Sequence, residues 1–138
     1  MRVVVETPKW SFTKYHLREG RIAREFLSPF PTPFNYGFVK GTVSDDGMPR
    51  DAIILGGKLR QGVEVEATDV GNSRFIDCGL EDDKVIASTD GKIGFFDKAM
   101  LDLFFTAYMA YKTVYHLVGR GKLVRCRYGG STLSPRPR

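Results

Sequence analysis

Residues 45–51 read Asp-Asp-Gly-Met-Pro-Arg-Asp and form an acidic loop between two strand-like segments, residues 36–43 and 52–55. Glycine and proline favour a turn here, and a solvated hairpin turn is one interpretation of the loop. Carboxylates that lie close together repel each other unless a cation neutralises them. The chain is otherwise basic, with 21 Lys and Arg residues against 16 Asp and Glu residues. The surrounding sequence therefore favours a site for a hard metal ion.

A second acidic segment follows at residues 77–83, where Asp77, Glu81, Asp82 and Asp83 cluster. The net charge of +5 favours an anionic partner such as phosphate, a nucleotide or a nucleic acid. A site for metal and phosphate needs acidic side chains to bind the metal and basic side chains to bind the phosphate, and acidic clusters in a basic chain provide both. Residues 129–138 contain Arg but no acidic residue, and we interpret them as a solvated basic tail.

The bulk composition predicts one globular domain, which we place at residues 1–128. The length of 138 residues suits a single core, and 42% hydrophobic residues indicate a packed chain. No apolar run is long enough to span a bilayer, and the start of the chain does not have a signal-peptide pattern. The two cysteines, Cys78 and Cys126, lack metal-ligand spacing. These features predict a cytoplasmic protein without a membrane partner.

The hydrophobic pattern predicts many short strands and one long helix. Residues 14–27 have the pattern of a hairpin that turns at Glu19-Gly20. Three prolines exclude a strand or helix at residues 28–33. The remaining strands are expected at residues 3–6, 36–43, 52–55, 62–70, 74–77, 84–88 and 122–128.

The helix is expected at residues 97–118, with Asp97 as its N-cap and Gly119 as its stop. Its aromatic and aliphatic residues fall on one broad face, which predicts packing against a sheet. The fold class is therefore α+β and mainly β: a small OB-like antiparallel β-barrel with one long helix from the C-terminal half packed against it.

An ordered series of motifs resembles the soluble family I inorganic pyrophosphatases. The order and spacing agree from Val3 to about Ser88, and the agreement is looser beyond that point. The chain is shorter than the usual member before the helix and at the C-terminus. The matching elements are Val-Val-Val-Glu-Thr-Pro at residues 3–8, Lys-Tyr at 14–15, Arg24, Pro-Phe-Asn-Tyr-Gly at 33–37, the loop at 46–51, Val-Gly at 70–71, Ile-Asp at 76–77 and Glu-Asp-Asp-Lys at 81–84.

The resemblance implies a magnesium-dependent hydrolase that cleaves pyrophosphate or a related small polyphosphate. It implies a first metal held by Asp46, Asp51 and Asp82, and further metals served by Asp77, Asp82 and Glu6. The resemblance also includes a Tyr-Lys pair late in the helix. Tyr111-Lys112 matches the dipeptide, whereas spacing to neighbouring motifs points to Tyr108 or Tyr115, so the tyrosine stays open. The implied phosphate-binding residues are Lys14, Arg24, Tyr36, Lys84, Tyr111, Lys112 and Tyr115.

The chain departs from the family pattern at several positions around this site. Met48 stands where the family has the Asp that deprotonates the attacking water, and loss of a general base costs about 10²–10⁴ in rate. His16 stands where a Glu follows the Lys-Tyr pair, and it is a candidate replacement base or a polar strand residue. Ala23 and Thr32 replace an Asp and a Tyr. Arg50 adds a guanidinium that can contact phosphate directly.

Three functions follow from these observations. The first is an inorganic diphosphatase, weakened or altered by Met48. The second is a catalytically impaired protein that binds a phosphorylated ligand or joins a true pyrophosphatase as a partner subunit. The third is a basic small barrel that binds nucleic acid, which the acidic clusters disfavour because they repel a phosphate backbone. The family resemblance also implies a homo-oligomer.

Overall fold

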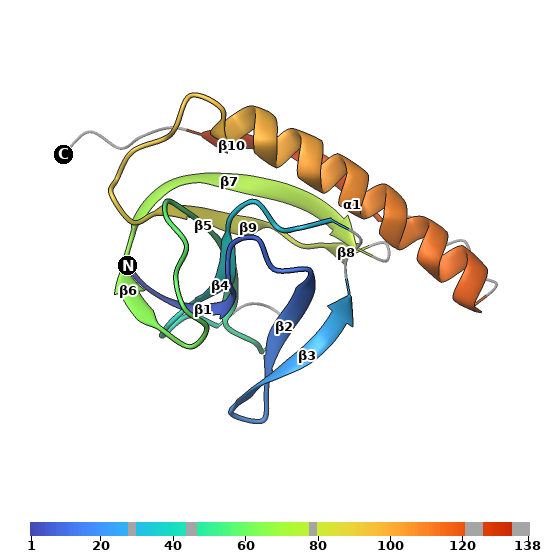
Figure 1. Ribbon diagram of the computed structural model, residues 1–138, viewed down its shortest axis with the longest axis horizontal. Helices are drawn as coiled ribbons and strands as arrows, with labels where there is room; N and C mark the ends of the chain where they lie inside the picture. Colours follow the sequence, from blue (N-terminus) through green and yellow to red (C-terminus); the bar gives the residue numbers. More distant parts are fainter. Residues whose placement is uncertain (28–29, 44–46, 78–79, 121–125, 134–138) are drawn as a thin grey trace.

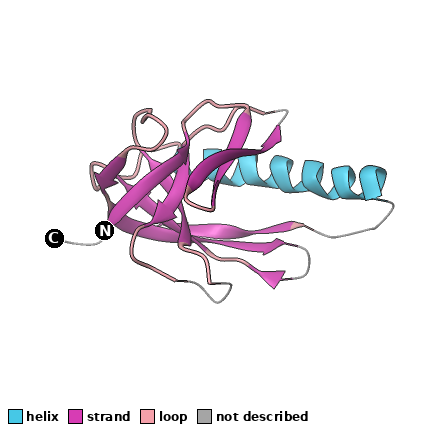
Figure 2. Cartoon of the chain, turned by 90° about the horizontal axis from the view of Figure 1, so that it is seen from below, coloured by secondary structure: helices cyan, strands magenta, loops and turns pink. Residues whose placement is uncertain are grey.

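The computed structural model describes residues 1–27, 30–43, 47–77, 80–120 and 126–133. It shows a large sheet, a separate two-stranded hairpin and one long helix (Figure 1). The helix α1 (Asp97–Arg120) lies along one face of the sheet (Figure 2). No helix in the described part of the chain is long and apolar enough to cross a membrane. The strands are β1 (Arg2–Thr7), β2 (Thr13–Arg18), β3 (Arg21–Leu27), β4 (Asn35–Val39), β5 (Arg50–Leu55), β6 (Glu64–Glu66), β7 (Thr68–Asp77), β8 (Leu80–Glu81), β9 (Lys84–Ser88) and β10 (Arg127–Leu133).

The large sheet has the strand order β10-β7-β9-β5-β4-β1-β6, and β8 pairs with β7. The pairs are antiparallel except for β5 and β9, which run parallel with Ala52 opposite Val85. Among the described residues no pairing joins the edge strands β10 and β6, so the sheet is OB-like but not a closed barrel. The mainly β class with one packed helix is confirmed.

Two apolar clusters cover the two faces of this sheet. One lies beneath α1 and is built around Phe34, Phe75, Leu101 and Phe105. The other contains Val3, Val5 and Ile54 with their neighbours, and partly buried side chains such as Val63 and Val65 pack against it. The central strands β5 and β9 are buried on both faces, which explains their continuous apolar sequences.

The β2–β3 hairpin forms at the predicted place because its turn sequence has the required backbone conformation. Glu19 and Gly20 both have positive φ, at 51° and 77°, and Arg18 pairs with Arg21. Two consecutive positive φ values match the tight turns that suit twisted hairpins. The hairpin forms its own two-stranded sheet beside β1.

Several predicted boundaries are wrong. Strand β4 ends at Val39, because the chain turns at Lys40 and Gly41, where φ is 80°. The strand predicted at 62–70 is split, since β6 pairs with β1 whereas β7 pairs with β9. Strand β7 then continues through Gly71, where the strand was expected to stop.

The ends of the helix and the last strand also differ from expectation. Asp97 is not the N-cap: Phe96 C=O accepts the first helical bond from Met100 N, and the Asp97 carboxylate accepts from Gly94 N. Helix α1 continues past Gly119 to Arg120. Strand β10 pairs with β7 over Arg127–Leu133, so residues 129–133 lie in the sheet and the boundary expected at Tyr128 falls inside a strand.

Candidate active site

The centre of the candidate site is a buried lysine held between two carboxylates. Lys84, which is 6% exposed at the start of β9, lies with Nζ 2.9 Å from Asp51 Oδ2 and 2.8 Å from Asp82 Oδ2. The parallel pairing of β5 and β9 produces this contact, because Asp51 and Lys84 directly precede the partners Ala52 and Val85. A cation placed here neutralises acidic side chains that would otherwise repel each other.

Tyr36 and Lys14 adjoin this cluster. The Nζ atoms of Lys14 and Lys84 lie 5.1 and 5.5 Å from the centroid of the Tyr36 ring. The Tyr36 hydroxyl is buried and has no hydrogen-bond partner among the described residues. Two ammonium groups and an unsatisfied hydroxyl therefore border the same space, which suits an anionic ligand.

Burial and charge shift the proton affinities of this cluster. Burial of the Tyr36 phenol raises its pKa well above the usual value, and the nearby Lys84 charge only partly opposes this effect. Burial alone would lower the pKa of Lys84. Interactions with Tyr36, Asp51 and Asp82 outweigh burial and hold that pKa well above its ordinary value. Lys84 therefore stays a cation at neutral pH.

A pocket opens between this cluster and α1. Lys14 Nζ also lies 5.7 Å from the Tyr108 ring centroid, so Lys14 connects the β2 strand to the helix face. The apolar residues of α1 that line this pocket were predicted only to pack in the core. The exception was Tyr108, which the neighbouring Phe104-Phe105 dipeptide made one of the candidates for phosphate binding. The lining residues are Thr7, Lys14, Thr32, Phe34, Tyr36, Lys84, Phe104, Phe105, Tyr108, Met109 and Lys112.

The structure separates the three candidate tyrosines of the helix. Tyr108 and Lys112 line the pocket. Tyr111 packs edge-on against Phe30, with ring centroids 6.5 Å apart, and its ring centroid lies 6.4 Å from that of Tyr115. Tyr115 is exposed. The structure thus places Tyr108, rather than Tyr111 or Tyr115, beside Lys112 and Lys14.

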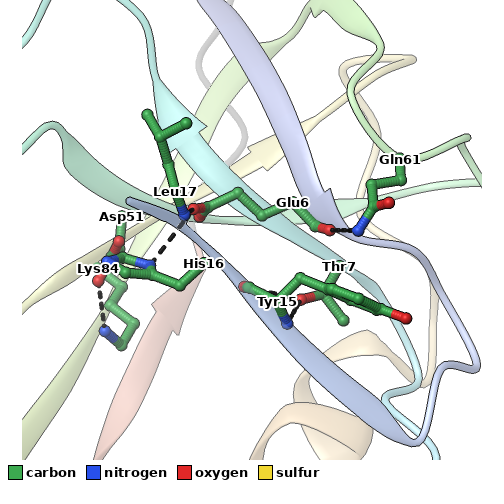
Figure 3. A network of polar contacts seen from close by, with 8 residues as sticks. All are labelled: Glu6, Thr7, Tyr15, His16, Leu17, Asp51, Gln61 and Lys84. Carbon is green, nitrogen blue, oxygen red and sulfur yellow. Dashed lines mark hydrogen bonds and ion pairs between the residues drawn. The ribbon is translucent and has the colours of Figure 1, made fainter. Parts of the chain in front are cut away.

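Glu6 and His16 form a second polar group next to Asp51 (Figure 3). Glu6 is 0% exposed, and its Oε2 accepts the Leu17 N–H and lies 3.3 Å from His16 Nδ1. A β-bulge places it there: Val5 faces Gly37 and Thr7 faces Tyr36, so Glu6 is the extra residue of β1. Bulges commonly re-aim a side chain beside a functional site.

The other predicted residues have more peripheral or undescribed positions. Arg24 is exposed on β3, Arg50 is exposed at the start of β5, and Met48 is 37% exposed in the preceding loop. Asp46 lies outside the described residues, and so does the side chain of Asp77 at the end of β7. The described structure therefore assembles Lys14, Tyr36, Lys84, Lys112, Asp51 and Asp82 at one place, with Glu6 adjacent.

The donor set fits a divalent cation. The carboxylates of Glu6, Asp51 and Asp82 are the oxygen ligands that magnesium prefers. Glu6 Oε1 is buried and has no hydrogen-bond partner among the described residues, so it retains an unsatisfied acceptor. Lys84 already neutralises part of this charge, and a cation at Asp51 or Asp82 has to share those carboxylates with it.

Fold and site together define a mainly β protein in which three lysines line one pocket, and one of them, the buried Lys84, is paired with the carboxylates of Asp51 and Asp82. Residues 3–114 match the model of the inorganic pyrophosphatase family, so the chain belongs to that family.

Individual relatives agree with this assignment. The chain is 36% identical over 92 residues to an inorganic pyrophosphatase of Saccharolobus solfataricus, covering 63% of this chain and 54% of the relative. It is 29% identical over 136 residues to one from Corynebacterium efficiens, covering 88% and 86%. The match spans only about half the length of the Saccharolobus protein and 42% of a soluble inorganic pyrophosphatase of rice.

Solved structures show the same fold. The inorganic pyrophosphatase from Thermus thermophilus superposes with a TM-score of 0.76 at 26% identity, covering 96% of this chain and 82% of that chain. The enzyme from Helicobacter pylori gives a TM-score of 0.77 at 24% identity, covering 96% and 84%. The second likeness supports the fold alone.

Proposed function

We propose that this protein is an inorganic diphosphatase that hydrolyses pyrophosphate, or a related small polyphosphate, with magnesium as its cofactor. The observation that carries the proposal is the position of Lys84 between Asp51 and Asp82, beside Tyr36. The carboxylates that would bind a cation thus lie against a lysine of the anion pocket, as hydrolysis of a highly charged anion requires.

The pocket residues provide the phosphate contacts in this proposal. Lys14 and Lys112 line the pocket with Lys84, and their ammonium groups donate hydrogen bonds to phosphoryl oxygens. Lys84 already donates to Asp51 and Asp82, so it has one N–H left for the anion. Tyr36 and Tyr108 donate from their hydroxyls. Arg24 and Arg50, which are exposed, are the predicted outer phosphate contacts, with bidentate geometry available to each guanidinium.

Asp51 and Asp82 are the proposed magnesium ligands, joined by Asp46, Asp77 and Glu6 as the resemblance implies. Magnesium, when bound, supplies charge neutralisation at the phosphoryl oxygens. The protein orients the anion with its lysines. The buried aromatic wall formed by Phe34, Phe104 and Phe105 limits water in the pocket and strengthens these electrostatic contacts.

The second candidate function is a catalytically impaired protein that binds a phosphorylated ligand or a partner subunit. Met48 favours it, because a thioether cannot take the proton that the family's Asp accepts at this position. The lysines and Tyr36 would retain anion affinity without rapid turnover. Binding and turnover must therefore be measured separately.

Phosphate release from pyrophosphate, with and without magnesium, tests the proposal. We expect magnesium-dependent turnover that falls by at least about 10²-fold in Lys84→Met, the scale of loss for one electrostatic donor. Calorimetric binding of pyrophosphate without turnover would support the second candidate. Equal turnover in an active wild type and in Lys84→Met would reject the hydrolase site, and equal pyrophosphate binding by the two proteins would reject the second candidate's site. A salt-sensitive shift of single-stranded DNA would support nucleic-acid binding instead.

A homo-oligomer and a cytoplasmic location complete the proposal. Exposed and half-buried apolar residues on α1 recur at spacings of four and three along one stripe, which suits a facing helix from a second copy. The stripe contains Leu103, Ala107, Ala110, Val114 and Leu117. Light scattering of Leu103→Glu beside the wild type tests the oligomer, and cell fractionation tests the location.

A further inference from the structure

Three side chains from three different strands bring possible metal ligands together next to the lysine cluster. Glu6 on β1, His16 on β2 and Asp51 on β5 each offer one ligand atom, and these atoms lie within 4.8 Å of one another. Figure 3 shows His16 close to both Glu6 and Asp51. The group therefore contains an imidazole nitrogen as well as carboxylate oxygens.

Glu6 gives independent support for a ligand at this position. The side chain is fully buried, and its Oε2 accepts the Leu17 N–H and lies 3.3 Å from His16 Nδ1. Oε1 has no hydrogen-bond partner among the described residues. A buried carboxylate oxygen without a partner is costly, and a bound cation removes that cost.

The nitrogen donor changes which cation fits best. Magnesium prefers an all-oxygen shell, whereas imidazole suits zinc, copper, iron and nickel. His16 also stands where the family pattern has a glutamate, so the site lacks the negative charge of that glutamate. Lys84 further offsets the charge of Asp51 at 2.9 Å. Both effects weaken a purely electrostatic site and favour a metal that gains from nitrogen coordination.

We propose that Glu6, His16 and Asp51 form a mixed nitrogen and oxygen site for a divalent transition metal, represented by Zn²⁺, which shares Glu6 and Asp51 with the proposed magnesium ligands. The inference builds on the divalent-cation chemistry proposed above. It is nevertheless tested by binding without pyrophosphate, so its failure is distinguishable from failure of the hydrolase assignment.

The site has a structural consequence for substrate binding. The β2–β3 hairpin is a separate sheet, and a metal bound by His16 joins it to β1 and β5 of the main sheet. Lys14 lies two residues before His16 and shares its strand face. Metal binding therefore fixes the strand that carries Lys14 over the pocket.

Calorimetry with Zn²⁺ and with Mg²⁺ on full-length protein tests the proposal. We expect His16→Gln to weaken Zn²⁺ binding by at least about tenfold and to leave Mg²⁺ binding within about twofold. The chain has two histidines, and the matched control His116→Gln should bind Zn²⁺ like the wild type. Unchanged Zn²⁺ affinity in His16→Gln, with circular dichroism showing both proteins folded, would overturn the site.

Two further measurements do not depend on affinity alone. In ¹⁵N-histidine NMR of the His116→Gln protein, Zn²⁺ should shift the remaining imidazole resonances, which belong to His16. In His16→Glu the preference for Zn²⁺ over Mg²⁺ should fall by at least about tenfold, because the site regains an all-oxygen donor set. Unshifted imidazole resonances, or an undiminished Zn²⁺ preference in His16→Glu, would show that His16 is not a ligand.

Discussion

Lys84 Nζ and Asp51 Oδ2 lie 2.9 Å apart, and this ion pair joins the parallel strands β9 and β5 at the edge of the pocket. The same ammonium reaches Asp82 at 2.8 Å, so one buried cation neutralises two carboxylates proposed as metal ligands. A divalent cation bound at the proposed ligands would therefore neutralise the same carboxylates as Lys84. This relationship makes stability and metal binding interdependent.

Replacement of Lys84 by methionine should destabilise the protein by about 1.5–3 kcal/mol, the scale of hydrogen bonds to charged groups, because it leaves the partly exposed carboxylates of Asp51 and Asp82 without their cation. Magnesium should recover part of this loss, so the variant should gain more in Tm from magnesium than the wild type. Urea unfolding with and without magnesium measures both effects.

Lys98→Met is the matched control for this prediction, since Lys98 forms an exposed pair with Asp102 at 2.7 Å. We expect a loss below about 1 kcal/mol in that variant. Equal losses at the two positions would mean that the Lys84 pairs are worth no more than an exposed surface pair.

Met48→Asp should increase turnover of pyrophosphate by about 10²–10⁴-fold, because it supplies a carboxylate where the family has its general base. Stopped phosphate-release assays at saturating magnesium measure the gain. Met100→Asp, at 39% exposure against 37% for Met48, controls for adding one surface acid. A decrease in turnover in Met48→Asp would indicate that this chain uses another group as base.

Tyr108→Phe should weaken pyrophosphate binding by about 10–100-fold, the effect of losing a hydrogen bond to a charged group worth about 1.5–3 kcal/mol. Tyr115→Phe should leave binding unchanged, because Tyr115 is exposed and does not line the pocket. Calorimetry on both variants measures the difference. The opposite ranking would show that the pocket beside Lys112 is not the phosphate site.

Gly37→Ala should prevent stable folding. A Cβ at Gly37 would lie 1.8 Å from Val4 O, at the close approach of β1 and β4 that also positions Glu6 and Tyr36. Gly57→Ala is the control, since nothing lies within 4 Å of its added Cβ. We expect that change to alter stability by less than about 1 kcal/mol. Thermal unfolding distinguishes the two, and a fully stable Gly37→Ala would contradict the observed β1–β4 spacing.

Acid should weaken the attachment of α1 to β10. Burial acts to raise the pKa of Asp102, but hydrogen bonds from Lys98 and Tyr128 outweigh it and hold that pKa below its usual value. A lowered folded-state pKa stabilises the protein above the unfolded value of about 3.9, and this contribution is lost as pH falls through the folded pKa.

The expected contribution of Asp102 is below about 1 kcal/mol, because its side chain is 41% exposed and solvent screens the pair. Urea unfolding over the acidic range should show a smaller pH dependence in Asp102→Asn than in the wild type. High salt should shrink the difference. An identical pH dependence of unfolding in the two proteins would show that Asp102 does not contribute to stability in this range.

Local sequence determined where the strands and the helix form, where the hairpin turns and to which family the chain belongs. Alternation and apolar runs are local properties, so β1, β9 and the body of α1 could be predicted within a residue or two. The positive φ values at Glu19 and Gly20 follow from the turn sequence itself. The ordered acidic and basic motifs predicted the family before any contact was known.

Tertiary structure alone decided which of these residues meet. The parallel pairing of β5 with β9 places Lys84 against Asp51, and the position of the pocket along α1 brings in Tyr108 rather than Tyr115, which lies about two turns further along the same helix face. The bulge in β1 turns Glu6 toward His16. Strand partners, the placement of a helix along a sheet and bulges depend on long-range packing, and a pattern of a few residues carries no information about that packing.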